Sequence, residues 1–293
     1  MRVGKIQRAD RIVNPYEFSC RDAMNIVYVI VDRLNIISAF KELGSTQQRK
    51  DALYALAFGQ LLVQSTFIPI TLTIPSIATY FGVDIDDASW SVIARLLVLG
   101  STVFLAARLG DRYGYVLVFF IGLVVMTVAN LLAATSGDLT QLIIWSGLGG
   151  IGGALVSANS NAILSVVFSP EERGRAFAVP VTASRVGTLL GVALYGVFLS
   201  FLNWRLVFIS TLLMGLLAIY YSYPMLKYHF QNVMGERKHI KINYLSAALL
   251  VATLSVFILS GSHIHDGSES FTSPEALSYH IPMHALALGL AAL

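Results

Sequence analysis

Two arginines lie well inside long apolar segments of this sequence, where charged side chains are rare. Arg95 belongs to the apolar segment 88–107 and Arg185 to the apolar segment 176–199. A charged side chain in the hydrocarbon core of a bilayer costs at least about 2.5 kcal/mol on insertion scales, and such residues often mark the path of a transported solute. Two guanidinium groups near mid-depth predict a cationic site for an anionic or carboxylate-bearing small molecule. The structural alternative is that each arginine pairs with backbone carbonyls or with an acidic residue elsewhere.

Two amides in the segment 139–168 add polar groups to the same hypothesis. Asn159 and Asn161 can hydrogen-bond a substrate or a neighbouring helix. With Arg95 and Arg185 they are the candidates for a substrate cavity. None of the seven complete apolar segments carries Asp or Glu in its interior, so this part of the protein offers no obvious proton carrier, and the sequence leaves the coupling ion open.

The elements that must position these residues are membrane helices. The chain is 56% hydrophobic and 13% charged, with a mean hydropathy of +0.69, whereas soluble domains carry about 25% charged residues. A bilayer core needs about 20 apolar residues per helix. The apolar segments of this length are 54–78, 88–107, 115–135, 139–168, 176–199, 203–223 and 243–260. An eighth segment, 279–293, is too short to cross, so the last helix is expected to be cut off, as in a fragment or a truncated product.

Charge placement predicts the orientation and the domain organisation. Of the 20 basic residues, 17 lie in the first fifty residues or in alternate loops, and Lys and Arg are retained on the cytoplasmic side. We therefore expect an inner (plasma) membrane protein with a cytoplasmic N-terminus. The expected parts are a cytoplasmic extension (1–50), a six-helix bundle (51–225), a basic linker (226–242) and extra transmembrane helices (243–293), the last cut off. The apolar stretch 23–40 of the extension is expected either to form a surface helix on the membrane or to pack on the bundle.

Several other functions are excluded by residue type and spacing. No basic run is interleaved with stacking aromatics, so no nucleic-acid partner is expected. Cys20 is the only cysteine, and the four histidines near the C-terminus lack the spacing of a metal site, so we expect no bound metal or cofactor. No nucleophile–base pair lies among the apolar segments, so we expect no catalytic residue. The glycines at 147–153 mimic a dinucleotide fingerprint, but Gly149 and Gly153 in G-x-x-x-G spacing instead predict close helix packing.

Four short segments, in order along the chain, resemble the major facilitator superfamily. Segment 107–114 (ARLGDRYG) is similar to the signature loop between the second and third helices of that family. Segment 72–78 (LTIPSIA) with Trp90, segment 168–176 (FSPEERGRA) and segment 204–208 (WRLVF) match further motifs. The resemblance runs from about residue 54 to the end and is greatest to the fourteen-helix drug:proton antiporter branch. It implies an all-α integral membrane protein, with the six-helix N-terminal bundle of that family plus one complete and one truncated helix.

The resemblance implies a conformational role for the signature loop. In the family this loop latches the two halves of the transporter together and releases during alternating access, so Gly110, Asp111, Arg112, Gly114 and Arg173 are conformational candidates. From the residues themselves, Asp111 is expected to face the amide end of the following helix, and Gly110 and Gly114 to permit a tight reversal. The alternative is a simple cap within a cluster of topogenic charges.

The departures from the family pattern concern proton antiport. The replaced residues weaken the expected latch of the signature loop. In the family pattern a buried arginine is associated with proton transfer and the first helix carries an acidic residue, and this sequence has neither at the matching positions. The resemblance implies alternating-access transport of a small molecule, with efflux as the expected direction, and a C-terminal half that a complete transporter requires. A degenerate, non-transporting membrane protein that acts as a binding or assembly partner is the alternative. The departing positions are Thr66, Ala107, Tyr115, Val116, Ser146, Gly149, Gly191 and Val192.

Overall fold

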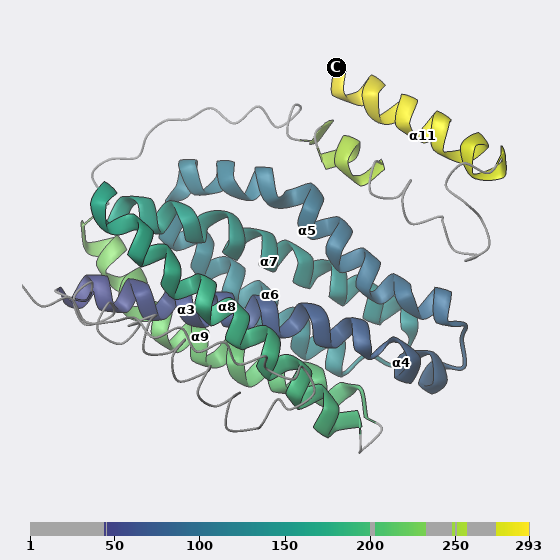
Figure 1. The fold of residues 1–293 in the computed structure, drawn as a ribbon, viewed down its shortest axis with the longest axis horizontal. Helices are drawn as coiled ribbons and strands as arrows, with labels where there is room; N and C mark the ends of the chain where they lie inside the picture. Colours follow the sequence, from purple (N-terminus) through teal and green to yellow (C-terminus); the bar gives the residue numbers. More distant parts are fainter. Residues whose placement is uncertain are drawn as a thin grey trace, which may run out of the picture. The chain divides into compact units, whose positions relative to one another are not determined.

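The computed structural model describes residues 44, 46–199, 203–232, 248–249, 251–256 and 274–292, and within these ranges it contains helices and no strand (Figure 1). The predicted surface helix near 23–40 lies outside the described residues, as does most of the segment 243–260. The helices with their bounds are α3 (Gln47–Leu72), α4 (Ile74–Phe81), α5 (Ile85–Tyr113), α6 (Tyr115–Ala134), α7 (Leu139–Val167), α8 (Pro170–Leu199), α9 (Arg205–Asn232) and α11 (Pro274–Ala292).

Six of these helices are long and apolar enough to cross a membrane, which confirms the predicted six-helix bundle. They are α3, α5, α6, α7, α8 and α9. α9 continues to Asn232, so the first part of the predicted linker is helical. In α11 the apolar part is the shorter stretch Ile281–Leu290.

The first predicted span is broken where its second proline lies. α3 ends at Leu72, and Thr73 separates it from α4, whose first turn contains Pro75. Proline lacks an N–H, so in a first helical turn it costs no helical hydrogen bond, whereas in a helix interior it removes one. Pro180, in contrast, lies inside the continuous helix α8.

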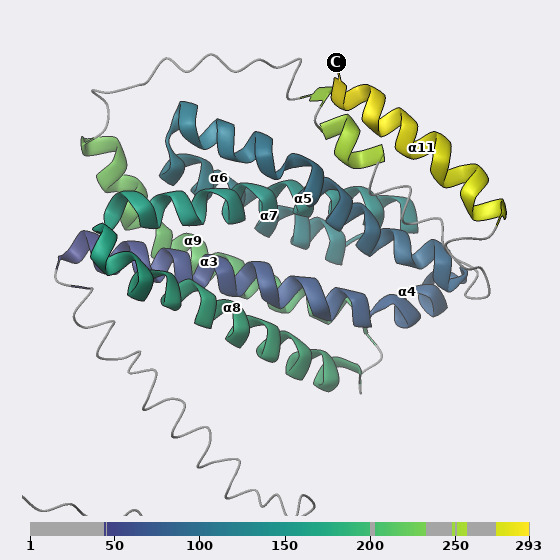
Figure 2. The same cartoon turned by 45° about the horizontal axis from the view of Figure 1, so that its top comes forward.

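Helix packing divides the bundle into two sets. α7 packs along α5 and α6, and α3 packs along α8 and α9, with further contacts between α6 and α9 and between α3 and α7 (Figures 1 and 2). Glycines permit the closest approaches, since a Cβ at Gly152 would lie 2.6 Å from the backbone nitrogen of Met126 in α6, and one at Gly187 would lie 2.6 Å from the carbonyl oxygen of Leu61 in α3. Small residues at membrane helix interfaces allow such backbone contact.

Candidate functional site

Arg95 is enclosed inside the bundle, between α5, α6 and α7. Only 2% of the residue is exposed, and its terminal nitrogen Nη2 donates a hydrogen bond of 3.0 Å to Oδ1 of Asn130 on α6. Opposite lies Gly149 of α7, where a Cβ would be 2.7 Å from Nη2 and 2.9 Å from Cζ of Arg95. The guanidinium group therefore fills the space that a side chain at position 149 would occupy.

Several buried polar atoms around Arg95 have no hydrogen-bond partner among the described residues. They are Nε and Nη1 of Arg95, Nδ2 of Asn130 and Oγ of Ser146. Ser146 lies one turn before Gly149 and Gly150 on the same face of α7, and both Asn130 and Ser146 are fully buried. The cluster is thus rich in donors and contains a formal positive charge.

Arg185 lies on a different surface of the molecule. It is exposed on α8, two residues from Gly187, whose Cα faces the backbone of Leu61 in α3. At 100° per residue, positions 185 and 187 point about 160° apart. Arg185 therefore points away from α3, and the structure does not bring it together with Arg95.

The two candidate asparagines also face in opposite directions. Nδ2 of Asn159 donates to the carbonyl oxygen of Ala106 on α5 at 3.2 Å and to that of Leu155 at 2.8 Å, and the residue is fully buried. Asn161 is exposed. Asn159 thus links α7 to α5, and of the two amides only that of Asn161 reaches the bundle surface.

The signature loop is a single-residue turn. α5 continues through Tyr113, and Gly114 has a positive φ of 98° before α6 begins at Tyr115. The tight reversal predicted for Gly114 is confirmed. The expectation for Gly110 was wrong, because this residue is helical, and its lack of a side chain makes room for the amide of Asn159, which a Cβ would overlap.

The expected contact of Asp111 with the start of the next helix is made, but through a side chain rather than a backbone amide. Asp111 lies in the last turn of α5, and α6 has no side-chain hydrogen bond at its N-terminus. Instead Oδ1 of Asp111 accepts a 2.8 Å hydrogen bond from the hydroxyl of Tyr115. Arg112 lies beside it with its guanidinium carbon 5.2 Å from the ring centre of Tyr113. Tyr115 stands where the resembled family has a basic residue. Its hydroxyl group therefore holds the carboxylate of Asp111 in place.

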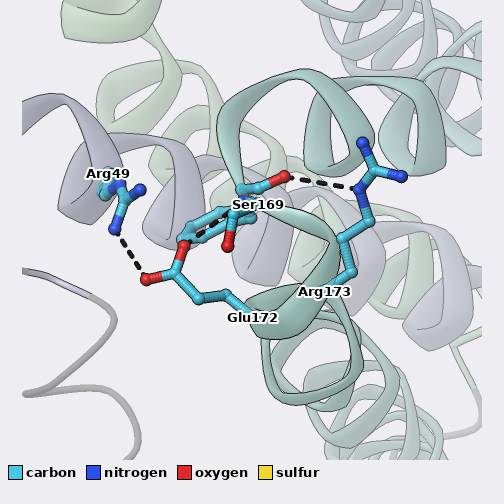
Figure 3. Close-up of polar contacts among 5 residues, drawn as sticks. Arg49, Ser169, Glu172 and Arg173 are labelled. Carbon is cyan, nitrogen blue, oxygen red and sulfur yellow. Dashed lines mark hydrogen bonds and ion pairs between the residues drawn. The ribbon is translucent and has the colours of Figure 1, made fainter.

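The corner between α7 and α8 is held by charged side chains (Figure 3). Arg173 donates from Nη2 to the carbonyl oxygen of Ser165 at 2.7 Å and from Nε to that of Phe168 at 3.3 Å, and so satisfies the carbonyl end of α7. Glu172 accepts from the backbone nitrogen of Ser169 at 3.3 Å and forms a 3.0 Å ion pair with Arg49 at the start of α3. These contacts join the ends of α3, α7 and α8.

The ion pair between Arg49 and Glu172 is expected to contribute little to the free energy of unfolding. Its side chains are 27% and 35% exposed, and exposed pairs contribute about 0.2–1 kcal/mol. We expect Arg49→Gln to lower the unfolding free energy by less than about 1 kcal/mol. Glu172→Gln should cost more, because it also weakens the cap on Ser169. Thermal unfolding of both single variants and the double variant measures the coupling; additive losses would contradict a direct interaction between the two side chains.

The structure adds three polar residues that the sequence analysis did not select. Asn130 binds Arg95, and Gln60 and Gln64, one turn apart on α3, are half-buried in the middle of that span. The signal was present in each case, because an amide inside an apolar span is as informative as a charge. Among the described residues no group of His, Cys, Asp or Glu side chains is placed to hold a metal ion.

Comparison with known proteins identifies relatives for most of the chain. A family model described as the Major Facilitator Superfamily matches residues 56–293. The chain is 25% identical over 185 residues to a riboflavin transporter of Clostridioides difficile, covering 63% of the chain and 40% of that relative. It is 27% identical over 210 residues to an uncharacterized MFS-type transporter of Mycobacterium tuberculosis, covering 71% of the chain and 39% of that relative. It is 25% identical over 167 residues to a tetracenomycin C resistance and export protein of Streptomyces glaucescens, covering 57% of the chain and 31% of that relative. The chain spans about two fifths of the length of the first two.

Proposed function

We propose that this chain, which belongs to the Major Facilitator Superfamily, contributes a six-helix bundle to a secondary transporter that moves a small molecule across a membrane by alternating access. The observation that carries the proposal is the family match over residues 56–293 together with six membrane-crossing helices. In this family two bundles rock around a site near the bilayer midplane. The transporting unit would therefore pair this bundle with a second one.

The names of the relatives support efflux as the direction of transport. Besides the export protein of Streptomyces glaucescens, they include a multidrug resistance protein of Mycobacterium tuberculosis and a puromycin resistance protein of Streptomyces alboniger. These names favour a transporter over a non-transporting assembly partner and over an enzyme. The fourteen-helix antiporter branch, the inner-membrane location and the cytoplasmic N-terminus remain proposals that rest on the motifs and on the basic residues of alternate loops.

We place the substrate surface on the exposed polar residues of the bundle. Arg185 is exposed on α8 and Asn161 on α7, whereas Gln60 and Gln64 belong to α3, from which Arg185 points away, and are left out of this surface. Arg185 lies about 22 Å along α8 at 1.5 Å per residue, near the middle of this helix. A guanidinium at that depth favours an anionic substrate. Arg95 and Asn159 are buried and therefore lie outside this surface.

A transport measurement in vesicles tests this proposal. The full reading frame would be reconstituted, and the uptake of anionic fluorescein, cationic ethidium and riboflavin compared with that of empty vesicles. We expect saturable fluorescein transport that Arg185→Gln lowers about tenfold, corresponding to loss of one charged contact of about 1.4 kcal/mol. Lys227→Gln, which removes an exposed charge near the end of α9, is the matched control and should leave transport unchanged.

Each other outcome would overturn a defined part of the proposal. Transport of ethidium alone would exclude an anionic substrate. Equal loss in the Arg185 and Lys227 variants would show a general effect of surface charge. Absence of transport for all three probes, with correctly folded protein, would favour the alternative that the protein is a non-transporting binding or assembly partner.

A further inference from the structure

We propose that Arg95, Asn130 and Ser146 form a binding site for one small monovalent inorganic anion, such as chloride, inside the bundle between α5, α6 and α7. This site is separate from the exposed surface assigned above to the substrate. The residues come from three different helices, and each is fully buried or nearly so.

Among the described residues, no acidic side chain forms an ion pair or a hydrogen bond with Arg95. The described parts of α5, α6 and α7 that enclose it, 88–107, 115–134 and 139–167, contain no Asp or Glu, and its one recorded hydrogen bond goes to a neutral amide oxygen. A buried ion without a partner is costly, because it has lost its hydration without gaining an opposite charge. An anion beside the guanidinium group offsets part of that cost by its Coulomb attraction.

The hydrogen-bond inventory of the cluster fits an anion. A guanidinium group has five N–H donors and an asparagine amide has two. Oδ1 of Asn130 is already used as the acceptor for Arg95, so that the unpartnered Nδ2, together with Nε and Nη1 of Arg95, presents only N–H groups. Ser146 adds a hydroxyl, which can donate as well as accept. Unused donors outnumber unused acceptors, which is the arrangement that an anion needs and a cation does not.

Size and charge restrict the class of anion. Only 2% of Arg95 is exposed, and the backbone of α7 at Gly149 and Gly150 lies directly against it. This enclosure excludes organic carboxylates of substrate size, and a single guanidinium group balances a single negative charge. Halides and nitrate fit both conditions. Such an ion would join α5, α6 and α7 and thereby stabilise this half of the bundle.

The test is the thermal stability of the purified protein in sodium chloride and in sodium gluconate of equal ionic strength. Ligands that bind only the folded state raise Tm in proportion to the logarithm of their concentration. We expect Tm to be higher in chloride by roughly 5 °C, with a saturable dependence on chloride and binding of radiolabelled chloride. Equal Tm values and no bound radiolabel would overturn the proposal. The unpartnered N–H groups of Arg95 and Asn130 would then be assigned to bound water.

Two variants make the test specific. Asn130→Asp supplies a fixed carboxylate beside Arg95, so it should fold, keep a high Tm in gluconate and lose both the chloride effect and the bound label. Arg185→Gln, which removes the exposed arginine of α8, should retain both. A chloride effect that persists in Asn130→Asp, or disappears in Arg185→Gln, would place the anion elsewhere. Neither measurement depends on transport, so the result is independent of the proposed function.

Discussion

Gly152→Ala is expected to lower the Tm of the protein by roughly 10 °C, although it adds a single methyl group. The new Cβ would lie 2.6 Å from the backbone nitrogen of Met126 and 2.8 Å from the carbonyl oxygen of Gly122. Both atoms belong to the backbone of α6, so no side-chain rotation relieves the overlap and the two helices must separate. Overpacking of this kind costs about 3 kcal/mol, and each kcal/mol shifts Tm by about 2–4 °C in a domain of this size.

Gly196→Ala is the matched control for this prediction. Gly196 is also a helical glycine, but nothing lies within 4 Å of a Cβ built there. Alanine favours the helix over glycine by about 0.5–1 kcal/mol, so Tm should stay equal or rise. Thermal unfolding of both variants in the same detergent decides the matter. A Gly152→Ala protein as stable as the wild type would mean that α6 and α7 are not held in backbone contact.

The second large effect is expected from removing the hydrogen-bond partner of Arg95. Asn130→Leu leaves the buried guanidinium group without an acceptor among the described residues. Isolating one member of a buried polar pair that carries a charge costs about 3 kcal/mol. We therefore expect a loss in Tm similar to that of Gly152→Ala, measured by thermal unfolding at a fixed chloride concentration.

A double-mutant cycle separates this mechanism from a simple packing defect. Arg95→Met removes the charge but keeps much of the side-chain volume, and the double variant Arg95→Met/Asn130→Leu replaces both polar groups by apolar ones. Exchange of a buried polar pair for apolar residues of similar shape is often nearly neutral. The double variant should therefore be more stable than Asn130→Leu alone. Independent, additive losses would show that the two side chains do not interact energetically.

The sequence was sufficient for the features that depend on local composition. The length of the apolar segments predicted the six crossing helices, because the thickness of the bilayer sets the length of each span. Gly114 indicated a tight reversal, since glycine adopts positive φ without strain. Each of these features is decided by a few neighbouring residues. The major facilitator fold followed from short motifs in order.

Only the tertiary structure decided which way the polar residues face. Arg95 and Arg185 both lie inside apolar spans, yet one is enclosed and the other exposed, and Asn159 and Asn161 differ in the same way. Lipid chains are as apolar as a leucine side chain, so hydrophobicity does not distinguish the lipid face of a membrane helix from its packed face. Thus Leu53 is fully buried while Leu189 is 70% exposed. The orientation of each helix, and with it the pairing of Arg95 with Asn130, depends on glycine contacts between helices distant in sequence.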